Sequence, residues 1–437
     1  MDDKHPLSDL FKNKNAVIGI IGLGYVGLPL AIRYSEEGFK VVGFDIDKSK
    51  VDRLQHKQSY IAHISDASIA QLHNSGFEST TDFAKTASCD ALIICVPTPL
   101  DRFRDPDISY IKNTLLQIKA HLRSGQIISL ESTTYPGTTD EEIIPLIVEK
   151  GFIPGKDIFV VFSPEREDPG RKDFNTQTTP KVVGGHTQAC LTAGIMLYNQ
   201  IVHKVVPVSS TRAAEMTKLL ENIHRAVNIG LVNEMKIVCD KMGLDVHEII
   251  DAAATKPFGF VPYRPGPGLG GHCIPIDPFY LTWKAREFGV HTRFIELAGE
   301  INSHMPTYVI EKIILALNSH KKSVSGANIL LLGVAYKKNV DDYRESPSLV
   351  LIDALEKLGA TVQYHDPYIP AFKHQEHGIV IDAKSIELTS SALSSADCIV
   401  IATDHDQLDY LEIQKSAKLI VDCRGRIRSK HDNVVRA

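Results

Sequence analysis

The chain has 437 residues, more than one hydrophobic core usually holds together, so two or three domains are expected. Hydrophobic residues make up 43% of it and charged residues 23%, which is ordinary for a soluble globular protein. The formal net charge of -5 excludes a general attraction to nucleic acid or to anionic membranes, so any anion site must be formed locally.

The cysteines and the start of the chain indicate a cytoplasmic protein with reduced thiols. The cysteine count of 7 is odd, and no pair has the CxxC spacing, so neither a zinc site nor a disulfide framework is predicted. The polar first segment lacks the apolar core of a signal peptide. The most apolar run, residues 16–32, is rich in glycine and is better explained by a strand and a turn than by a membrane span.

The first elements form a β-α-β unit. Residues 16–24 are a β-branched run ending in glycines, residues 26–38 have helical character, and residues 41–47 are a second apolar run. Strands that alternate with helical stretches predict a parallel sheet with helices on both faces, a doubly wound domain. Further buried strands are predicted at residues 91–97, 126–133, 158–164 and 205–209.

The pattern changes between Ser209 and Met242. This stretch has no proline and one interior glycine, and Gly243 follows it, so it predicts a single long helix with a glycine cap. At 1.5 Å per residue the helix would be ~50 Å long, enough to bridge two domains. Residues 258–278 are dense in glycine and proline and predict a shaped loop.

A second α/β pattern occupies the last part of the chain. Only Gly333 remains there of the glycine fingerprint, so this half is expected to bind a nucleotide differently. The predicted fold is α/β, with two doubly wound Rossmann-like domains joined by a long central helix and a helical domain. The second set of strands and helix is predicted at residues 328–337, 346–359, 361–368, 397–403 and 418–425.

A dinucleotide site is predicted at the first β-α turn. Gly22 permits the tight turn, Gly24 lets the backbone approach a pyrophosphate, and Gly27 lets helix and strand pack closely. Asp45 stands at the end of the next strand, where an acid can accept a hydrogen bond from a ribose hydroxyl. Its charge favours NAD over NADP, although Lys48 and Lys50 lie nearby. The alternative is a glycine turn that binds nothing.

Cys273 is the candidate nucleophile. Gly270 and Gly271 precede it closely, so little side-chain bulk lies on one side and backbone amides are free to face an anion. A thiolate can capture an aldehyde as a thiohemiacetal, which hydride loss converts to a thioester and water to an acid. Asp277 follows four residues later and could anchor the loop or orient a water. The alternative is a tight turn with an incidental cysteine. Cys95, Cys239 and Cys398 differ from Cys273 because they lie in apolar segments, where a buried, inert thiol is expected.

The long helix carries a second group of candidates. Lys218, Asn222 and Arg225 have the spacing i, i+4 and i+7, so they share a face that could hold a diphosphate or a developing alkoxide. The alternative is a solvated stripe. Leu219 and Ile223 beside them favour a buried position for Lys218 and Asn222.

Two polar loops follow predicted strands, where open α/β sheets bind their ligands. Thr133 lies in the first loop and could hold a water, and Glu165 lies in the second and could act as a general base on a thioester.

Motifs along almost the whole chain resemble those of the UDP-glucose/GDP-mannose dehydrogenases. The resemblance implies an NAD-binding domain at residues 1–207, a central helical domain at 208–306 that forms the dimer, and a sugar-nucleotide domain at 307–437. It also implies a precursor for bacterial surface polysaccharide. The net charge and the lack of a membrane span predict no nucleic-acid or membrane partner. The motifs occur in the family's order: GLGYVGLPLA, FDID, VPTP, ESTTYPGTT, FSPER, AEMTKLLEN, PGPGLGGHCIPIDP, LGVAYKKNVDDYRESPS and HDPY.

The resemblance assigns roles residue by residue. It makes Cys273 the nucleophile, Lys218 and Asp277 the stabilisers of alkoxide and oxyanion, and Glu165 the acid/base of thioester hydrolysis. Asn222 and Thr133 hold substrate and water. Cofactor contacts are implied for Gly22, Gly24, Tyr25, Val26, Gly27, Asp45, Lys50, Thr98, Thr133 and Arg344. Substrate contacts are implied for Glu165, Arg166, Lys218, Asn222, Arg225, Gly270 and Lys337, and for Arg264 from the partner subunit.

Within the family, residues 163–170 and 222–234 look like the branch acting on UDP-N-acetylhexosamines, with UDP-N-acetylglucosamine as the preferred interpretation. Arg166 and Arg225 would shape a pocket for an acetamido group. UDP-glucose and the N-acetylgalactosamine and N-acetylmannosamine epimers stay open. Two other classes are a regulator that binds a nucleotide sugar without chemistry and a two-electron hydroxyacid dehydrogenase.

Overall fold

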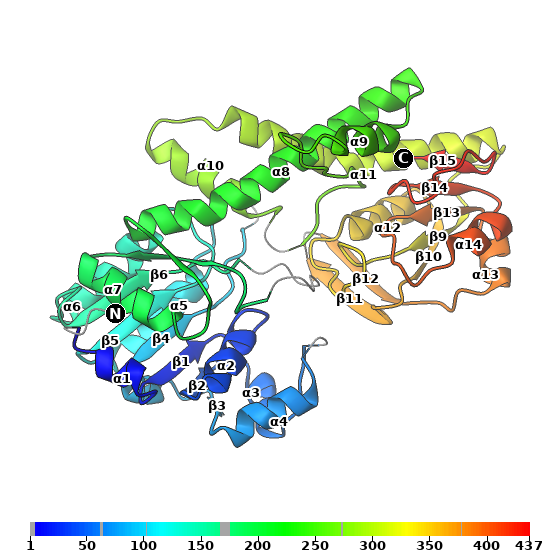
Figure 1. Ribbon diagram of the computed structural model, residues 1–437. Helices are drawn as coiled ribbons and strands as arrows, with labels where there is room; N and C mark the ends of the chain where they lie inside the picture. Colours follow the sequence, from blue (N-terminus) through cyan, green and yellow to red (C-terminus); the bar gives the residue numbers. More distant parts are fainter. Residues whose placement is uncertain (1–4, 62–63, 102, 167–174, 272–273, 377) are drawn as a thin grey trace. The chain divides into compact units, whose positions relative to one another are not determined.

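A computed structural model describes residues 5–61, 64–101, 103–166, 175–271, 274–376 and 378–437. The chain divides into two compact units, residues 1–221 with 283–289 and residues 222–282 with 290–437. Each unit contains its own sheet and its own core, and the division falls within the longest helix (Figure 1). The fold is α/β with two Rossmann-like sheets, as predicted.

The first unit is built on an 8-stranded sheet of order β3-β2-β1-β4-β5-β6-β7-β8. Neighbouring strands are parallel except β6 and β7, which are antiparallel. The order reverses between β1 and β4, which is where doubly wound sheets open a crevice for ligands. The strands are β1 (Val17–Ile21), β2 (Lys40–Phe44), β3 (Glu78–Thr80), β4 (Ala91–Ile94), β5 (Gln126–Leu130), β6 (Ile158–Phe162), β7 (Lys181–Gly185) and β8 (Val205–Val208).

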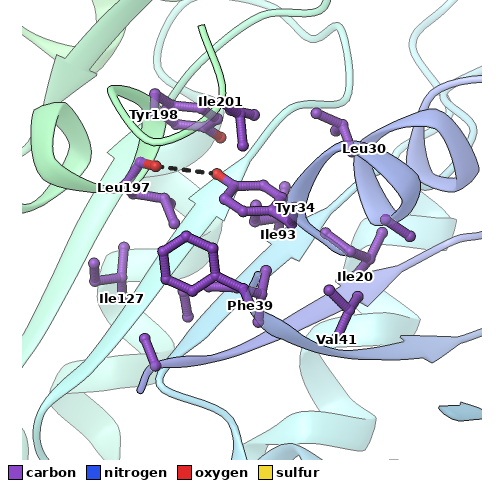
Figure 2. Packing of buried hydrophobic residues seen from close by; sticks show 14 of the residues in the cluster. Ile20, Leu30, Tyr34, Phe39, Val41, Ile93, Ile127, Leu197, Tyr198 and Ile201 are labelled. Carbon is purple, nitrogen blue, oxygen red and sulfur yellow. Dashed lines mark hydrogen bonds between the residues drawn. The ribbon is translucent and has the colours of Figure 1, made fainter. Parts of the chain in front are cut away.

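Both faces of this sheet are buried, because successive side chains point to opposite faces and nearly all are apolar. Ile20 and Ile93 belong to one core, and Ile21 and Ile94 belong to the other. Figure 2 shows the first core, where the Tyr34 hydroxyl donates a 3.4 Å hydrogen bond to the carbonyl of Leu197.

Helices cover both faces of the first sheet. Side chains from α2, α4 and α7 fill one core, and those from α5 and α6 fill the other. Side-chain caps fix several starts; for example, Asp47 accepts the Ser49 N–H at the start of α3. The helices are α1 (Ser8–Lys12), α2 (Gly27–Glu36), α3 (Lys48–Gln55), α4 (Asp66–Asn74), η1 (Phe83–Ser88), α5 (Ser109–Lys119), η2 (Thr139–Ile143), α6 (Ile144–Glu149) and α7 (Gln188–Tyr198).

The predicted long helix is α8 (Thr211–Met242), and it ends as predicted on Gly243. Gly243 has φ +70°, and the Leu244 N–H returns to the carbonyl of Cys239. Near the start of α8, the buried Glu215 carboxylate accepts the N–H groups of Gly137 and Thr139, which ties the helix to the loop after β5.

The second unit contains a parallel 5-stranded sheet of order β10-β9-β13-β14-β15 and a separate antiparallel pair, β11 and β12. Helices α11 and α12 pack on one face of the 5-stranded sheet, and α13 and α14 pack on the other. Strands are β9 (Asn328–Leu332), β10 (Thr361–His365), β11 (Ala371–Glu376), β12 (Ile379–Lys384), β13 (Cys398–Ile401), β14 (Ile420–Asp422) and β15 (Val434–Arg436). Helices are α9 (Val246–Ala254), α11 (Arg293–Ser319), α12 (Pro347–Lys357), α13 (Ser390–Ser395) and α14 (Tyr410–Ser416). Helix α10 (Asp277–Glu287) begins in the second unit, and its residues from 283 on belong to the first.

Sequence patterns missed β3, β7, the β11–β12 pair and β15, all short or weakly apolar. The boundaries of the three predicted domains stay a prediction. Helix α11 crosses the boundary that was predicted after residue 306. Among the described residues, no helix is long and apolar enough to cross a membrane.

Candidate active site

Five parallel strands of the first unit end at the same edge of its sheet, and the predicted ligand-binding loops follow them. Because β2, β1, β4, β5 and β6 are neighbours in this order, the loops after them are neighbours too. The residues concerned are Asp45 after β2, Gly22 and Gly24 after β1, Thr98 after β4, Thr133 after β5 and Glu165 after β6.

The glycine turn after β1 has the geometry that a dinucleotide needs. Gly22 has φ +91°, and a side chain there would meet the carbonyl oxygen of Cys95. A Cβ on Gly27 would lie 1.9 Å from the carbonyl oxygen of Gly22, so strand and helix meet without space for a methyl group. A Cβ on Gly24 would meet no described atom within 4 Å apart from its chain neighbours, which leaves that face open to a pyrophosphate beside the start of α2. Tyr25 is exposed and Val26 half-buried.

The Asp45 carboxylate is fixed by this turn. One oxygen accepts the Leu23 N–H at 3.0 Å, and the other accepts the Asp47 N–H at 2.9 Å. Lys50 lies 3.6 Å from Asp45, whereas Lys48 pairs with Asp52 and does not contact it. Asp45 is buried, and each of its oxygens can still accept a ribose hydroxyl. These residues therefore fit NAD.

The loops after β4 and β5 are joined to each other. The Ser132 hydroxyl donates to the carbonyl of Val96 at 2.7 Å. Thr98 is buried and Thr133 half-buried in these two loops. The hydrogen bond thus joins the two loops that carry Thr98 and Thr133, which the family resemblance implicates in cofactor and water binding.

A buried ion pair that the sequence did not reveal lies beside Glu165. The Lys181 ammonium is 2.7 Å from the Glu131 carboxylate and 3.9 Å from that of Glu165. Glu131 also accepts the Tyr198 hydroxyl at 2.7 Å. Because β7 is antiparallel to β6, Lys181 at its start lies at the sheet edge where β6 ends.

The two carboxylates control the charge of this lysine. Burial alone would lower the pKa of Lys181, but Glu131 and Glu165 raise it above its ordinary value. Lys181 is therefore a permanent buried cation next to the proposed acid/base.

Arg166 follows Glu165 and is also held in place. Its guanidinium donates to the Glu221 carboxylate of α8 at 2.6 Å and to the carbonyl of Pro180 at 2.6 Å. Arg166 therefore connects the loop after β6 to α8, and its role at the substrate stays a prediction.

The predicted stripe on α8 divides into buried and exposed positions. Lys218 and Asn222, one turn apart, are buried, whereas Arg225 is exposed. The Asn222 amide donates to the Asp277 carboxylate at 2.5 Å, and Asp277 is buried at the start of α10. The structure thus brings together two residues that are 55 positions apart and that the resemblance assigns to one centre.

The glycines before Cys273 are closely packed within the second unit. A Cβ on Gly270 would lie 2.7 Å from the Tyr336 Cβ, and the Gly271 N–H donates to the carbonyl of Arg344 at 3.2 Å. Lys337 is half-buried with its ammonium 5.6 Å from the centre of the Tyr336 ring. Cys273 itself lies outside the described residues.

The two predicted arginines of the second unit are paired. The Arg344 guanidinium binds the Asp342 carboxylate in a two-point contact, and Arg264 is paired with Asp251 of α9. The cofactor contact of Arg344 and the contact of Arg264 with the substrate of the partner subunit both stay predictions.

The six described cysteines are unpaired, and all but the half-buried Cys95 are fully buried. Burial raises the pKa of Cys89 and of Cys423 to about 12 and holds that of Cys95 well above its ordinary value. Thiols with raised pKa values are poor nucleophiles at neutral pH, so these three cysteines are inert.

Comparison with known proteins gives one family over most of the chain. Residues 16–202 match the NAD binding domain of the UDP-glucose/GDP-mannose dehydrogenase family, residues 212–304 its central domain, and residues 330–429 its UDP binding domain.

Relatives span nearly the same length. Protein CapL of Staphylococcus aureus is 34% identical over 96% of this chain and 98% of its own. A UDP-N-acetyl-D-glucosamine 6-dehydrogenase of Pseudomonas aeruginosa is 32% identical over 93% and 94%. Among solved structures, a UDP-D-ManNAc dehydrogenase of Pyrococcus horikoshii superposes with a TM-score of 0.86, with 32% identity over 96% and 98% of the two chains. The expected family, fold and cofactor are confirmed: the chain belongs to the UDP-glucose/GDP-mannose dehydrogenase family and is an NAD-dependent UDP-sugar dehydrogenase.

Proposed function

We propose that the protein oxidises carbon 6 of a UDP-N-acetylhexosamine, UDP-N-acetylglucosamine in the first place, from alcohol to carboxylate through a covalent intermediate on Cys273. The observation that carries the proposal is the buried hydrogen bond between Asn222 and Asp277. It orients a carboxylate four residues after Cys273 and ties it to α8, one turn from the buried Lys218.

The proposed reaction has four steps. The alcohol loses a proton and a hydride to give an aldehyde, and the Cys273 thiol adds to that aldehyde as a thiohemiacetal. A second loss of proton and hydride gives a thioester, and water cleaves its carbon–sulfur bond to release the acid and the thiol. The glycine turn after β1 and Asp45 would hold NAD⁺, which when bound would accept the hydride in both oxidations.

The chain's own residues would stabilise the charges and move the protons. Lys218 would stabilise the negative charge of a developing alkoxide. Asn222 and Asp277 together would stabilise the oxyanion of the intermediate. Glu165 would take a proton from the hydrolytic water, which Thr133 helps to hold, and the Lys181 ammonium lies 3.9 Å from the Glu165 carboxylate.

The substrate is tested by the rate at which each of several sugar nucleotides reduces NAD⁺ and NADP⁺. The panel contains UDP-N-acetylglucosamine, its galactosamine and mannosamine epimers, UDP-glucose and GDP-mannose. The highest kcat/KM is expected for UDP-N-acetylglucosamine with NAD⁺. The panel is needed because the two relatives at 32% identity carry names for different sugars. Preference for another sugar would correct the proposal, and no reduction of NAD⁺ with any of them would favour a non-catalytic binding protein.

Two variants test the covalent route. Cys273→Ser should bind both ligands without steady-state turnover, while Cys398→Ala, a buried thiol of β13, serves as the control and should stay active. Glu165→Gln should slow hydrolysis and accumulate a thioester adduct visible by intact mass. An active Cys273→Ser variant would contradict the covalent route, and slow turnover of Glu165→Gln without an adduct would contradict the role of Glu165.

We further propose a homodimer formed by α8, in the cytoplasm. Leu231, Met235, Val238 and Met242 form a stripe at i, i+4, i+7 and i+11, with 54%, 40%, 44% and 66% of their surface exposed. A continuous apolar stripe of this length needs a partner, and the same stripe on a second copy would match it. Leu231→Glu should yield a monomer by light scattering, and an unchanged mass would contradict the assignment.

The unpaired described cysteines agree with a reducing compartment.

The uronate product would serve as a precursor for bacterial surface polysaccharide.

A further inference from the structure

The second unit has an acidic residue, Asp366, at the position that Asp45 has in the first. Both follow the strand next to the first strand of their sheet, β10 beside β9 and β2 beside β1. Asp366 is only 2% exposed, and its oxygens accept backbone N–H groups of the second unit. The donors are Val334 at 2.8 Å and Ala335 at 3.0 Å to one oxygen, and Tyr368 at 2.8 Å and Ile369 at 3.2 Å to the other.

A buried histidine completes the surroundings of Asp366. His405 Nε2 lies 3.0 Å from Asp366 Oδ2, and His405 Nδ1 accepts the Asn339 N–H at 2.9 Å. Since Nδ1 must be an acceptor, Nε2 carries the proton and donates it to the carboxylate. Burial alone would raise the pKa of Asp366, but the hydrogen bonds from His405 and the backbone lower it below its ordinary value. Asp366 is therefore a carboxylate with its acceptor positions directed at protein donors.

These contacts hold both ends of the short segment 335–339. At its first end, the Thr403 hydroxyl donates to the carbonyl of Ala335 at 2.6 Å. At its last end, Asn339 adopts φ +62° and its side-chain amide donates to Asp406 at 2.6 Å. We call Asp366, Thr403, His405 and Asp406 the clamp.

The clamped segment carries Lys337 and supports the loop that leads to Cys273. Its Tyr336 ring covers Gly271, where a Cβ would lie 2.8 Å from the ring, and its Tyr336 Cβ lies close to Gly270. Gly271 has φ +85°, so the tight contact and the backbone both require glycine there. Displacing segment 335–339 would therefore move Lys337 and loosen the support of the glycine loop together.

We propose that Asp366 and His405 are positioning residues for sugar-nucleotide binding, acting through segment 335–339 and its Lys337. The inference rests on the proposed substrate contact of Lys337. It also explains why the second unit lacks the full glycine fingerprint. The acid at its strand end, Asp366, binds and orders a protein loop, whereas Asp45 is proposed to bind a ribose.

The test measures affinities of the full-length protein for UDP, UDP-N-acetylglucosamine and NAD⁺ by calorimetry. His405→Phe keeps the ring beside Tyr368, 5.0 Å away, and removes both hydrogen bonds. It should lower the affinity for UDP and for UDP-N-acetylglucosamine by about tenfold, because a segment that has lost its order must regain it on binding. The affinity for NAD⁺ should change less than twofold. His405→Gln retains a donor and an acceptor and should recover most of the affinity.

Leu393→Ala is the matched control, because Leu393 is buried in the core on the other face of the second sheet. It should lower Tm without the selective loss of UDP affinity. A Lys337→Ala background should reduce the effect of His405→Phe, since both changes act on the same contact. Should His405→Phe fail to fold, Thr403→Val removes one clamp hydrogen bond and should still weaken UDP selectively.

The outcomes separate this inference from the proposed function. If the wild-type protein binds neither UDP ligand, the proposed function and the inference both fail. If it binds them and the clamp variants bind UDP as tightly as the wild type, or lose UDP and NAD⁺ affinity equally, the inference alone is wrong.

Discussion

Replacing Lys181 by methionine isolates the buried ion pair beside Glu165. Lys181 and Glu131 have side-chain exposures of 6% and 0%, so the change leaves a carboxylate in the interior with its charge uncompensated. Removing one partner of a buried pair costs about 3–5 kcal/mol of unfolding free energy. For a unit of this size that corresponds to a Tm lower by ~10 °C. Circular dichroism melts and urea titrations measure both quantities.

The double variant Lys181→Met with Glu131→Gln should recover more than half of that loss, because position 131 no longer carries a charge and the Tyr198 hydroxyl keeps its hydrogen bond. Lys204→Met, a change of the same type at an exposed lysine, is the control and should lie within about 0.5 kcal/mol of the wild type. A loss below about 1 kcal/mol for Lys181→Met, or a double variant no more stable than the single one, would refute the assignment of a coupled buried pair.

Three further changes test other parts of the structure. Asp45→Ala should weaken NAD⁺ by about tenfold and NADP⁺ less, and equal losses in fluorescence titrations would mean that the acid does not contact the ribose. Gly27→Ala forces a methyl group onto the Gly22 carbonyl and should lower Tm and NAD⁺ affinity; unchanged values would contradict the turn geometry. Burial lowers the pKa of Lys236 to about 8, below its ordinary value of 10.5. Between these two pH values folding releases a proton from this lysine, so its contribution makes the free energy of unfolding rise with pH there. Lys236→Met should remove that rise from urea midpoints, and parallel pH curves for the two proteins would contradict it.

Periodicity and glycine spacing predicted the architecture well, because buried strands and a capped long helix leave strong local patterns. Strand β7 was missed because residues 181–185 are few, contain two glycines and begin with a lysine. Its reversed direction, which positions Lys181 beside Glu165, depends on pairing with β6 and has no local signal.

The candidate site was predictable where motifs specify backbone geometry or one helix face. Lys218 and Asn222 are buried, whereas Arg225 is exposed, because exposure depends on which elements pack over each turn. The Asn222–Asp277 hydrogen bond joins distant segments and required the structure. Asp366 was within reach, since aligning the two halves places it opposite Asp45, but its partner His405 on another loop was not.

The central claim is a four-electron oxidation through Cys273, and the ratio of NADH formed to sugar consumed tests it most directly. Single-turnover experiments with limiting UDP-N-acetylglucosamine should give two NADH per sugar and a uronate product, without release of free aldehyde. One NADH per sugar, with an aldehyde or ketone as the product, would contradict the account.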